Sequence, residues 1–248
     1  MTSLRKTWDI REFGKVNLPE IIGQVSPKFS AFRENNRIRV LDMPIYMPGQ
    51  GWKIPSEIAD QFGELISLVE KSENRFEGGL QEHYVYITID QKIVQKGSTG
   101  RRAGAHSDAY VESKGAQIDI TPENIETLSN QPSETVGHTY VISDVLPTEF
   151  FSVPFPLTKG SCGEALRTFE EIAASAVPVT YPTNTLLRMD PFVVHRCAIS
   201  PITTPRTFVK ISVSKKRYAR IGNTINPSFQ YDWEMTARSP HTRNHPWA

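Results

Sequence analysis

Residues 84–89 have the sequence Tyr-Val-Tyr-Ile-Thr-Ile, and this stretch sets the fold class. Its even positions carry Tyr or Thr and its odd positions carry Val or Ile, an alternation typical of a β-strand with two different faces. Five further strand-like segments follow, each bounded by Gly, Pro, Asn or Asp: 105–111, 139–143, 185–189, 192–197 and 207–213. The sequence therefore predicts that strands dominate from residue 84 onward.

Two segments have the spacing of helices instead. Residues 56–71 and residues 162–176 place apolar side chains three and four positions apart, which predicts one buried face on each helix. Helices do not alternate regularly with the strands, so a doubly wound parallel sheet is not expected. We expect a mainly β protein, with one closed or sandwiched β core and flanking helices.

The length and composition agree with one folded domain. The chain has 248 residues, of which 38% are hydrophobic and 22% charged, as in an ordinary globular protein with a core of its own. We expect residues 1–248 to form a single domain. Within it, we expect residues 84–214 to be the core, residues 1–83 a helical and loop buttress, and residues 215–248 a tail.

Charge and cysteine usage exclude several classes of protein. The formal net charge of +1 provides no overall attraction to nucleic acid, so a nucleic-acid partner is not expected. No apolar run is long enough to span a membrane, and the first residues do not resemble a signal peptide. The two cysteines, Cys162 and Cys197, do not form a disulfide scaffold, so we expect a reduced, cytoplasmic setting.

A candidate metal site comes from two of the six histidines. His106 and Asp108 are two residues apart in a strand-like segment, so their side chains would point to the same face. His195 lies in a short apolar segment, where a buried imidazole needs a partner. Two histidines and one carboxylate form the facial triad that binds non-haem Fe(II). Taken singly, His106 is also compatible with a surface position, and His195 with a core histidine bonded to a backbone carbonyl.

A candidate anion site lies further along the chain. Arg206 enters an otherwise apolar strand, where burying a guanidinium is costly unless it meets an anion. The planar guanidinium suits the far carboxylate of a dicarboxylic acid. Lys210 shares the expected strand face of Arg206 and is a second candidate for that carboxylate.

With these residues in this order, the chain resembles the Fe(II)/2-oxoglutarate-dependent dioxygenases over roughly residues 84–214. The resemblance rests on His106-Ser107-Asp108, His195 and Arg206. It implies a double-stranded β-helix, or jelly roll, similar to that of cupins. It also implies that His106, Asp108 and His195 bind iron and that Arg206 binds the distal carboxylate of 2-oxoglutarate. One departure is Phe208, since many members have Ser or Thr two residues after the arginine.

The reaction that the resemblance implies is oxidation of an unactivated C–H bond, most simply a hydroxylation. Its substrate would be a small molecule or amino-acid-like compound, with O2 consumed and succinate and CO2 released. The carboxylate of Asp108 favours this outcome over halogenation, because halogenating relatives have Gly or Ala at that position.

Two other classes of protein stay open. One is a jelly-roll oxygenase that uses iron without 2-oxoglutarate, and the other is a non-catalytic β-sandwich that binds a partner. Phosphate-loop, dinucleotide-binding and nucleophile-elbow motifs do not occur in the sequence. The remaining histidines are not expected to be metal ligands: His83, His138, His241 and His245.

Overall fold

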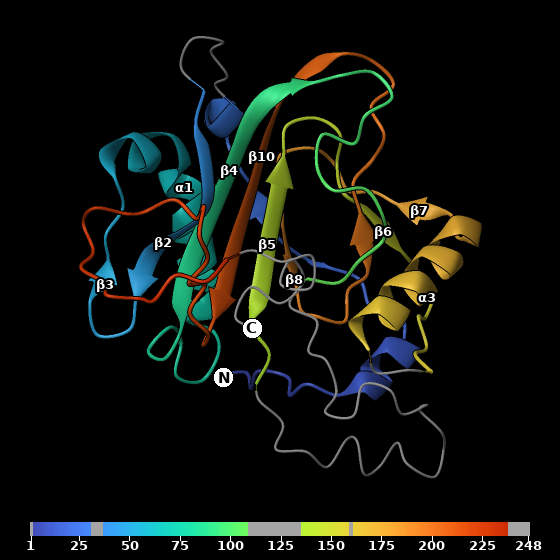
Figure 1. The fold of residues 1–248 in the computed structure, drawn as a ribbon, viewed down its shortest axis with the longest axis horizontal. Helices are drawn as coiled ribbons and strands as arrows, with labels where there is room; N and C mark the ends of the chain where they lie inside the picture. The colour runs from blue at the N-terminus through green and yellow to red at the C-terminus, as the bar shows by residue number, and fades with distance from the viewer. Residues whose placement is uncertain (1, 31–36, 109–134, 159–160, 238–248) are drawn as a thin grey trace.

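Two antiparallel sheets form the centre of the molecule. The structure is a computed structural model that describes residues 2–30, 37–108, 135–158 and 161–237 (Figure 1). The larger sheet has seven strands in the spatial order β1 (Glu20–Gln24), β8 (Thr185–Met189), β5 (His138–Ser143), β10 (Thr204–Ser214), β4 (Tyr84–Val94), β2 (Arg39–Met47) and β3 (Gly51–Trp52). The smaller sheet has the order β7 (Pro178–Val179), β6 (Glu149–Phe151) and β9 (His195–Arg196).

The path of the chain between these sheets is that of a jelly roll. From β4 in the large sheet, the chain passes to His106, which pairs with β9 of the small sheet through an isolated bridge. It then returns to β5, crosses to β6 and β7, returns to β8, crosses to β9 and ends in β10 of the large sheet. The predicted mainly β fold with a jelly-roll core and flanking helices is confirmed.

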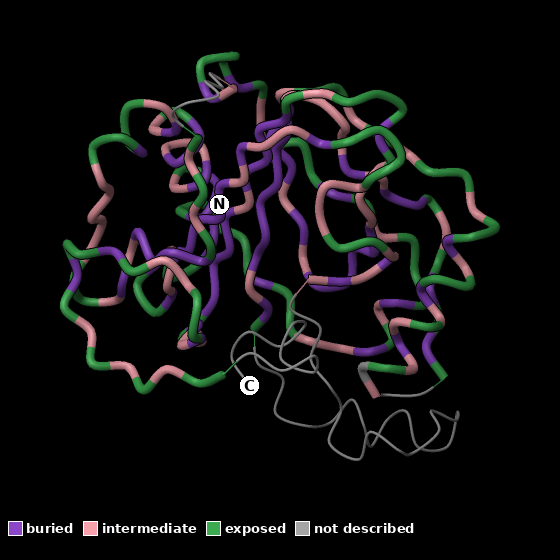
Figure 2. The backbone as a smooth tube through the Cα atoms, turned by 45° about the horizontal axis from the view of Figure 1, so that its top comes forward, coloured by how far each residue is buried: buried purple, intermediate pink, exposed green. Residues whose placement is uncertain are grey.

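Strand β10 shows how the sequence sorts its side chains between the two faces of the large sheet. Val209, Ile211 and Val213 belong to the core cluster that includes the apolar face of α1 (Ser56–Glu73). Phe208 faces the other way and packs with Phe150 of the small sheet. In Figure 1, α1 accordingly covers one face of the large sheet, and the small sheet lies on the side of α3 (Cys162–Ser175). Figure 2 shows that the buried positions are concentrated in the strands between these layers.

The N-terminal part of the chain contributes strands that the sequence analysis did not predict. Residues 1–83 supply β1, β2 and β3, besides α1 and two short 3-10 helices, Ile10–Gly14 and Pro27–Ser30. In β2 the side-chain alternation is broken, because the pairing with β4 shifts register twice and Asp42 has a φ of 43°. An irregular strand of this kind loses the period-two signal by which strands are recognised.

The predicted strands also differ in length from the observed ones. β4 and β10 each extend over 11 residues, whereas the strand predicted at 192–197 shrinks to His195–Arg196. The preceding residues form a turn instead, closed by a hydrogen bond from the Val193 N–H to the Asp190 carbonyl. The end of the segment predicted at 105–111 lies outside the described residues.

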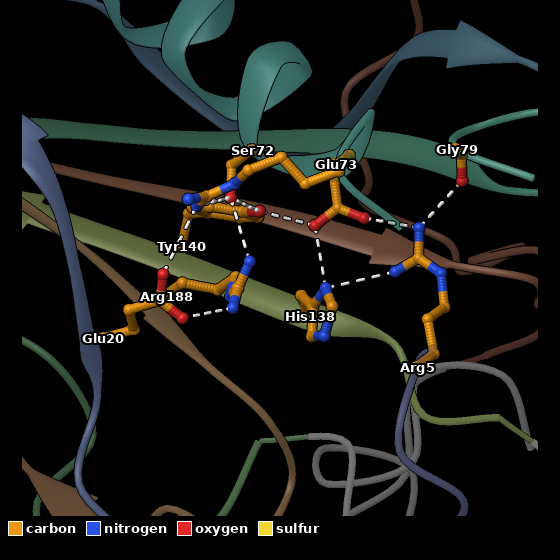
Figure 3. A network of polar contacts seen from close by, with 9 residues as sticks. Arg5, Glu20, Ser72, Glu73, Gly79, His138, Tyr140 and Arg188 are labelled. Atoms are coloured by element: carbon orange, nitrogen blue, oxygen red, sulfur yellow. Dashed lines mark hydrogen bonds and ion pairs between the residues drawn. The ribbon is translucent and has the colours of Figure 1, made fainter. Parts of the chain in front are cut away.

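A buried polar network ties three parts of the fold together (Figure 3). Glu73, at the end of α1, is fully buried and pairs with the Arg5 guanidinium at 2.6 Å. Its other oxygen lies 2.8 Å from His138 Nδ1 and accepts a hydrogen bond from the Tyr140 hydroxyl, both residues being on β5. Arg5 also donates to the Gly79 carbonyl. The N-terminal segment, α1 and β5 are thereby joined through one carboxylate.

The segment that follows β10 packs back onto the sheet. The Tyr218 ring stacks on that of Tyr86, with centroids 4.1 Å apart, and the Tyr218 N–H donates to the Tyr86 hydroxyl. Buried Asn226 donates to the Pro44 and Lys53 carbonyls. Among the described helices, none has the length and apolar character that crossing a membrane requires.

Candidate metal centre

The fold brings His106 and His195 directly opposite each other. Their backbones form an antiparallel bridge in which each N–H donates to the other residue's carbonyl at 2.9 Å, and their ring centroids are 4.5 Å apart. Asp108 follows two residues after His106. One donor atom from each of the three side chains lies within 4.8 Å of the other two. The three predicted ligands therefore converge, although His106 and His195 are 89 positions apart in the chain.

This spacing is close to that of a bound metal site. Imidazole nitrogens and carboxylate oxygens about 2.1 Å from one ion are at most about 4.2 Å apart. Side-chain movements of less than about 1 Å would therefore bring the three donors to a common ion. Two imidazoles and one carboxylate leave open positions on an octahedral metal and are the donor set of non-haem Fe(II) sites.

Hydrogen bonds to backbone carbonyls orient both imidazoles. His106 Nδ1 lies 2.9 Å from the Gly104 carbonyl oxygen, and His195 Nδ1 lies 3.1 Å from the Val193 carbonyl oxygen. A carbonyl can only accept, so Nδ1 carries the proton in each ring. Nε2 is then the nitrogen with a free electron pair, as a metal ligand must be. The alternative interpretation of His195, a core histidine bonded to a backbone carbonyl, describes the same contact and does not compete with ligation.

The electrostatic environment keeps all three groups in their ligating forms near neutral pH. Burial, followed by the proximity of His195, lowers the pKa of His106 to about 4. Burial likewise lowers the pKa of His195. Burial would raise the pKa of Asp108, but Lys210 and the two imidazoles outweigh it, so that pKa lies below its usual range. The site thus presents two neutral imidazoles and one carboxylate, which bind a metal without first losing protons.

Two further side chains hold the His106–Asp108 segment in place. The buried Ser107 hydroxyl donates to the Pro191 carbonyl, in the turn that precedes His195. Glu170 on α3 accepts a hydrogen bond from the Ala105 N–H at 2.9 Å. The sequence analysis named Ser107 only as part of the His106–Asp108 motif and did not consider Glu170. Ser107 could have been noticed from its position between two ligands, whereas nothing in the sequence relates Glu170 to residue 105.

Arg206 is buried on β10, in the large sheet. It is 2% exposed, and its Nε and Nη2 donate to the carbonyls of Val145 and Leu146 at 3.2 and 3.0 Å. No described carboxylate forms an ion pair with it. Burial lowers the pKa of Arg206, and the neighbouring Arg101 lowers it further. The guanidinium is therefore fixed by neutral partners and keeps a positive charge available for an anion.

The other residues considered from the sequence lie outside the centre or only border it. His138 is bound to Glu73, and neither ring nitrogen of buried His83 has a hydrogen-bond partner among the described residues. His241 and His245 lie outside the described residues. Cys197 is half-buried, and burial raises the pKa of its thiol.

No protein-family model and no curated protein sequence matches the chain. Three solved structures have distant likeness to it. AviO1 from Streptomyces viridochromogenes Tue57 is 12% identical, with a TM-score of 0.37 over 92% of this chain and 100% of that one. HygX from Streptomyces hygroscopicus, solved with nickel and 2-oxoglutarate bound, is 8% identical, with a TM-score of 0.39 over 87% and 91%. EvdMO1 is 15% identical, with a TM-score of 0.33 over 83% and 49%. At such scores, these likenesses assign no function to this chain.

Proposed function

We propose that this chain is an Fe(II)- and 2-oxoglutarate-dependent dioxygenase that oxidises a C–H bond of a small molecule. The observation that carries the proposal is the convergence of His106, Asp108 and His195 on one point between the two sheets. Iron and 2-oxoglutarate, when bound, would supply the O2-dependent oxidising chemistry, with succinate and CO2 as the other products.

The metal ligands act through their protonation states and their fixed orientation. With Nδ1–H bonded to the Gly104 and Val193 carbonyls, Nε2 of each imidazole would be the nitrogen that binds the metal. The histidines are neutral and Asp108 is ionised, so the site offers one negative charge to a divalent ion. His195 is 5% exposed, which limits the access of water to this side of the centre.

Arg206 acts as the anchor for the distal carboxylate of 2-oxoglutarate. Two of its nitrogens donate to backbone carbonyls, which hold the guanidinium in one orientation and leave other N–H groups for a carboxylate. A cation buried without a carboxylate partner is expensive, and an incoming dicarboxylate offsets that cost. Phe208, which stands where many relatives have Ser or Thr, packs its ring 5.0 Å from the Arg206 guanidinium instead of donating a hydrogen bond.

The test is turnover of 2-oxoglutarate by purified protein supplied with Fe(II) and ascorbate. The wild-type chain should form succinate, and His195→Ala and Asp108→Ala should abolish it. Arg206→Met should raise the KM for 2-oxoglutarate at least tenfold, because it removes a charge-assisted contact. Arg167→Met serves as the control, since that arginine is exposed on α3 and pairs with Glu164.

Succinate formation that persists in both ligand variants would refute the metal assignment. A wild-type protein that binds iron but neither binds nor consumes 2-oxoglutarate would be an iron enzyme of another kind. A protein that binds no metal would be the non-catalytic sandwich.

A further inference from the structure

Three cations of the interior form no ion pair with a carboxylate of the described residues, although two of them act electrostatically on Asp108: Arg101, Arg206 and Lys210. Cations nearby do have such partners. Arg196 pairs with Glu149 at 2.6 Å, and Lys92 pairs with Asp90 at 2.6 Å. Half-buried Lys210 forms neither an ion pair nor a hydrogen bond through its ammonium group within the described part of the chain. Unpaired cations in such a setting are unfavourable unless a ligand supplies the counter-charge.

These cations lie around one aromatic side chain on β10. The guanidinium carbons of Arg101 and Arg206 are 4.5 and 5.0 Å from the centroid of the Phe208 ring. Lys210 is two residues further along the same strand face, with Thr88 and Val141 as its cross-strand neighbours. Both Lys210 and Arg101 act electrostatically on Asp108 and His195, so they lie toward the metal centre.

Arg206 and Lys210 lie on the same face of β10, with Phe208 between them. Four residues of extended strand separate their Cα atoms by roughly 13 Å. Arg206 is fully buried and held by backbone carbonyls, whereas Lys210 is half-buried and its ammonium group has no hydrogen-bond partner among the described residues. Arg206 is therefore a fixed cation and Lys210 a movable one, so the two can serve different anions.

The balance of charge supports a second anion. Asp90 also acts on Arg206, but it pairs with Lys92, so these two charges cancel. The three cations and a divalent metal are then opposed by Asp108, by Asp144, which lies near Arg206, and by the two charges of 2-oxoglutarate. One positive charge is left over in this count. A ligand with one negative charge beside Lys210 would neutralise this remaining positive charge.

We propose, building on the function proposed above, that Lys210 together with Arg101 binds a carboxylate of the substrate and so selects a carboxylic acid over its neutral analogue. Lys210 supplies three N–H donors on a flexible stem, and Arg101 supplies a planar donor group at the Phe208 ring. The substrate carboxylate would then lie beside the metal centre. The contacts that place the rest of the substrate would differ from one carboxylic acid to another.

Binding measurements on a form that cannot turn over test this proposal. Protein loaded with Mn(II) and saturated with 2-oxoglutarate is titrated calorimetrically with benzoate and, separately, with benzamide, its neutral isostere. Wild type should bind benzoate at least tenfold more tightly than benzamide. Lys210→Met should weaken benzoate binding about tenfold or more, leaving the Kd of 2-oxoglutarate within about twofold. Lys96→Met, at an exposed lysine, should behave as wild type.

The inference is wrong if Lys210→Met leaves benzoate binding unaffected. It is also wrong if wild type does not bind benzoate at millimolar concentration, or binds benzamide as tightly as benzoate. A loss of 2-oxoglutarate affinity in Lys210→Met as large as that in Arg206→Met would overturn it too, because Lys210 would then serve the co-substrate. Failure of the proposed function itself looks different, since wild type would not bind 2-oxoglutarate before any benzoate is added.

Discussion

At the scale of the residue, the backbone around each histidine decides what the imidazole can do. His106 and His195 both turn Nδ1 toward a carbonyl two residues earlier in the chain. That His106 and Asp108 lie close together could be predicted from the sequence, because side chains at i and i+2 share a strand face. The residues that support them could not be, because Glu170 reaches the Ala105 N–H only through the packing of α3.

Glu170 gives a direct test at this scale. Glu170→Ala frees the Ala105 N–H and loosens the segment that carries His106, so the affinity for Mn(II) should fall about tenfold. Glu170→Gln keeps an oxygen acceptor and should retain most of the affinity. Glu171→Ala, at the next and exposed position of the same helix, is the matched control. Equal Mn(II) affinities for all three variants and wild type would show that Glu170 does not position the ligand.

At the scale of the element, regular alternation was a reliable guide and irregular pairing was not. The strand predicted at 185–189 coincides with β8, and the helix predicted at 162–176 begins where α3 begins. β2 was missed because its register shifts and the left-handed backbone at Asp42 break the alternation. The short β1, at the edge of the sheet, has three exposed positions of five and offers little pattern to detect.

The end of α1 depends on the Glu73 carboxylate. Burial would raise the pKa of Glu73, but His138 and Arg5 lower it to about 2. A carboxyl group whose pKa is lower in the folded than in the unfolded state stabilises the fold above the unfolded pKa, and the contribution is lost as the pH falls toward the folded pKa. Glu73→Gln should therefore lower the free energy of unfolding by roughly 2–3 kcal/mol at neutral pH.

Urea unfolding across a pH series measures this effect. The difference between wild type and Glu73→Gln should shrink as the pH falls from about 4.5 toward about 2. Glu77→Gln, at an exposed position shortly after α1, should match wild type throughout. A difference that stays constant over this range would mean that the charge of Glu73 does not stabilise the fold.

At the scale of the whole molecule, the site exists because a jelly roll folds distant strands onto one another. The spacing of His106, His195 and Arg206 along the chain predicts no contact by itself. The two histidines meet because His106 pairs with β9 in the small sheet, while Arg206 lies on β10 in the large sheet, beside β4 and β5. The order of strands within each sheet is a tertiary property, and alternation patterns within single strands do not contain it.

The central claim, that His106, Asp108 and His195 bind one metal ion, is tested most directly by metal stoichiometry. Apo-protein is dialysed anaerobically against Fe(II), and its iron content is measured for wild type, Asp108→Ala, His195→Ala and the exposed-carboxylate control Asp60→Ala. The account predicts one iron per chain in wild type and the control, and loss of stoichiometric iron in both ligand variants. Wild-type protein without stoichiometric iron, or ligand variants that retain it, would contradict the account.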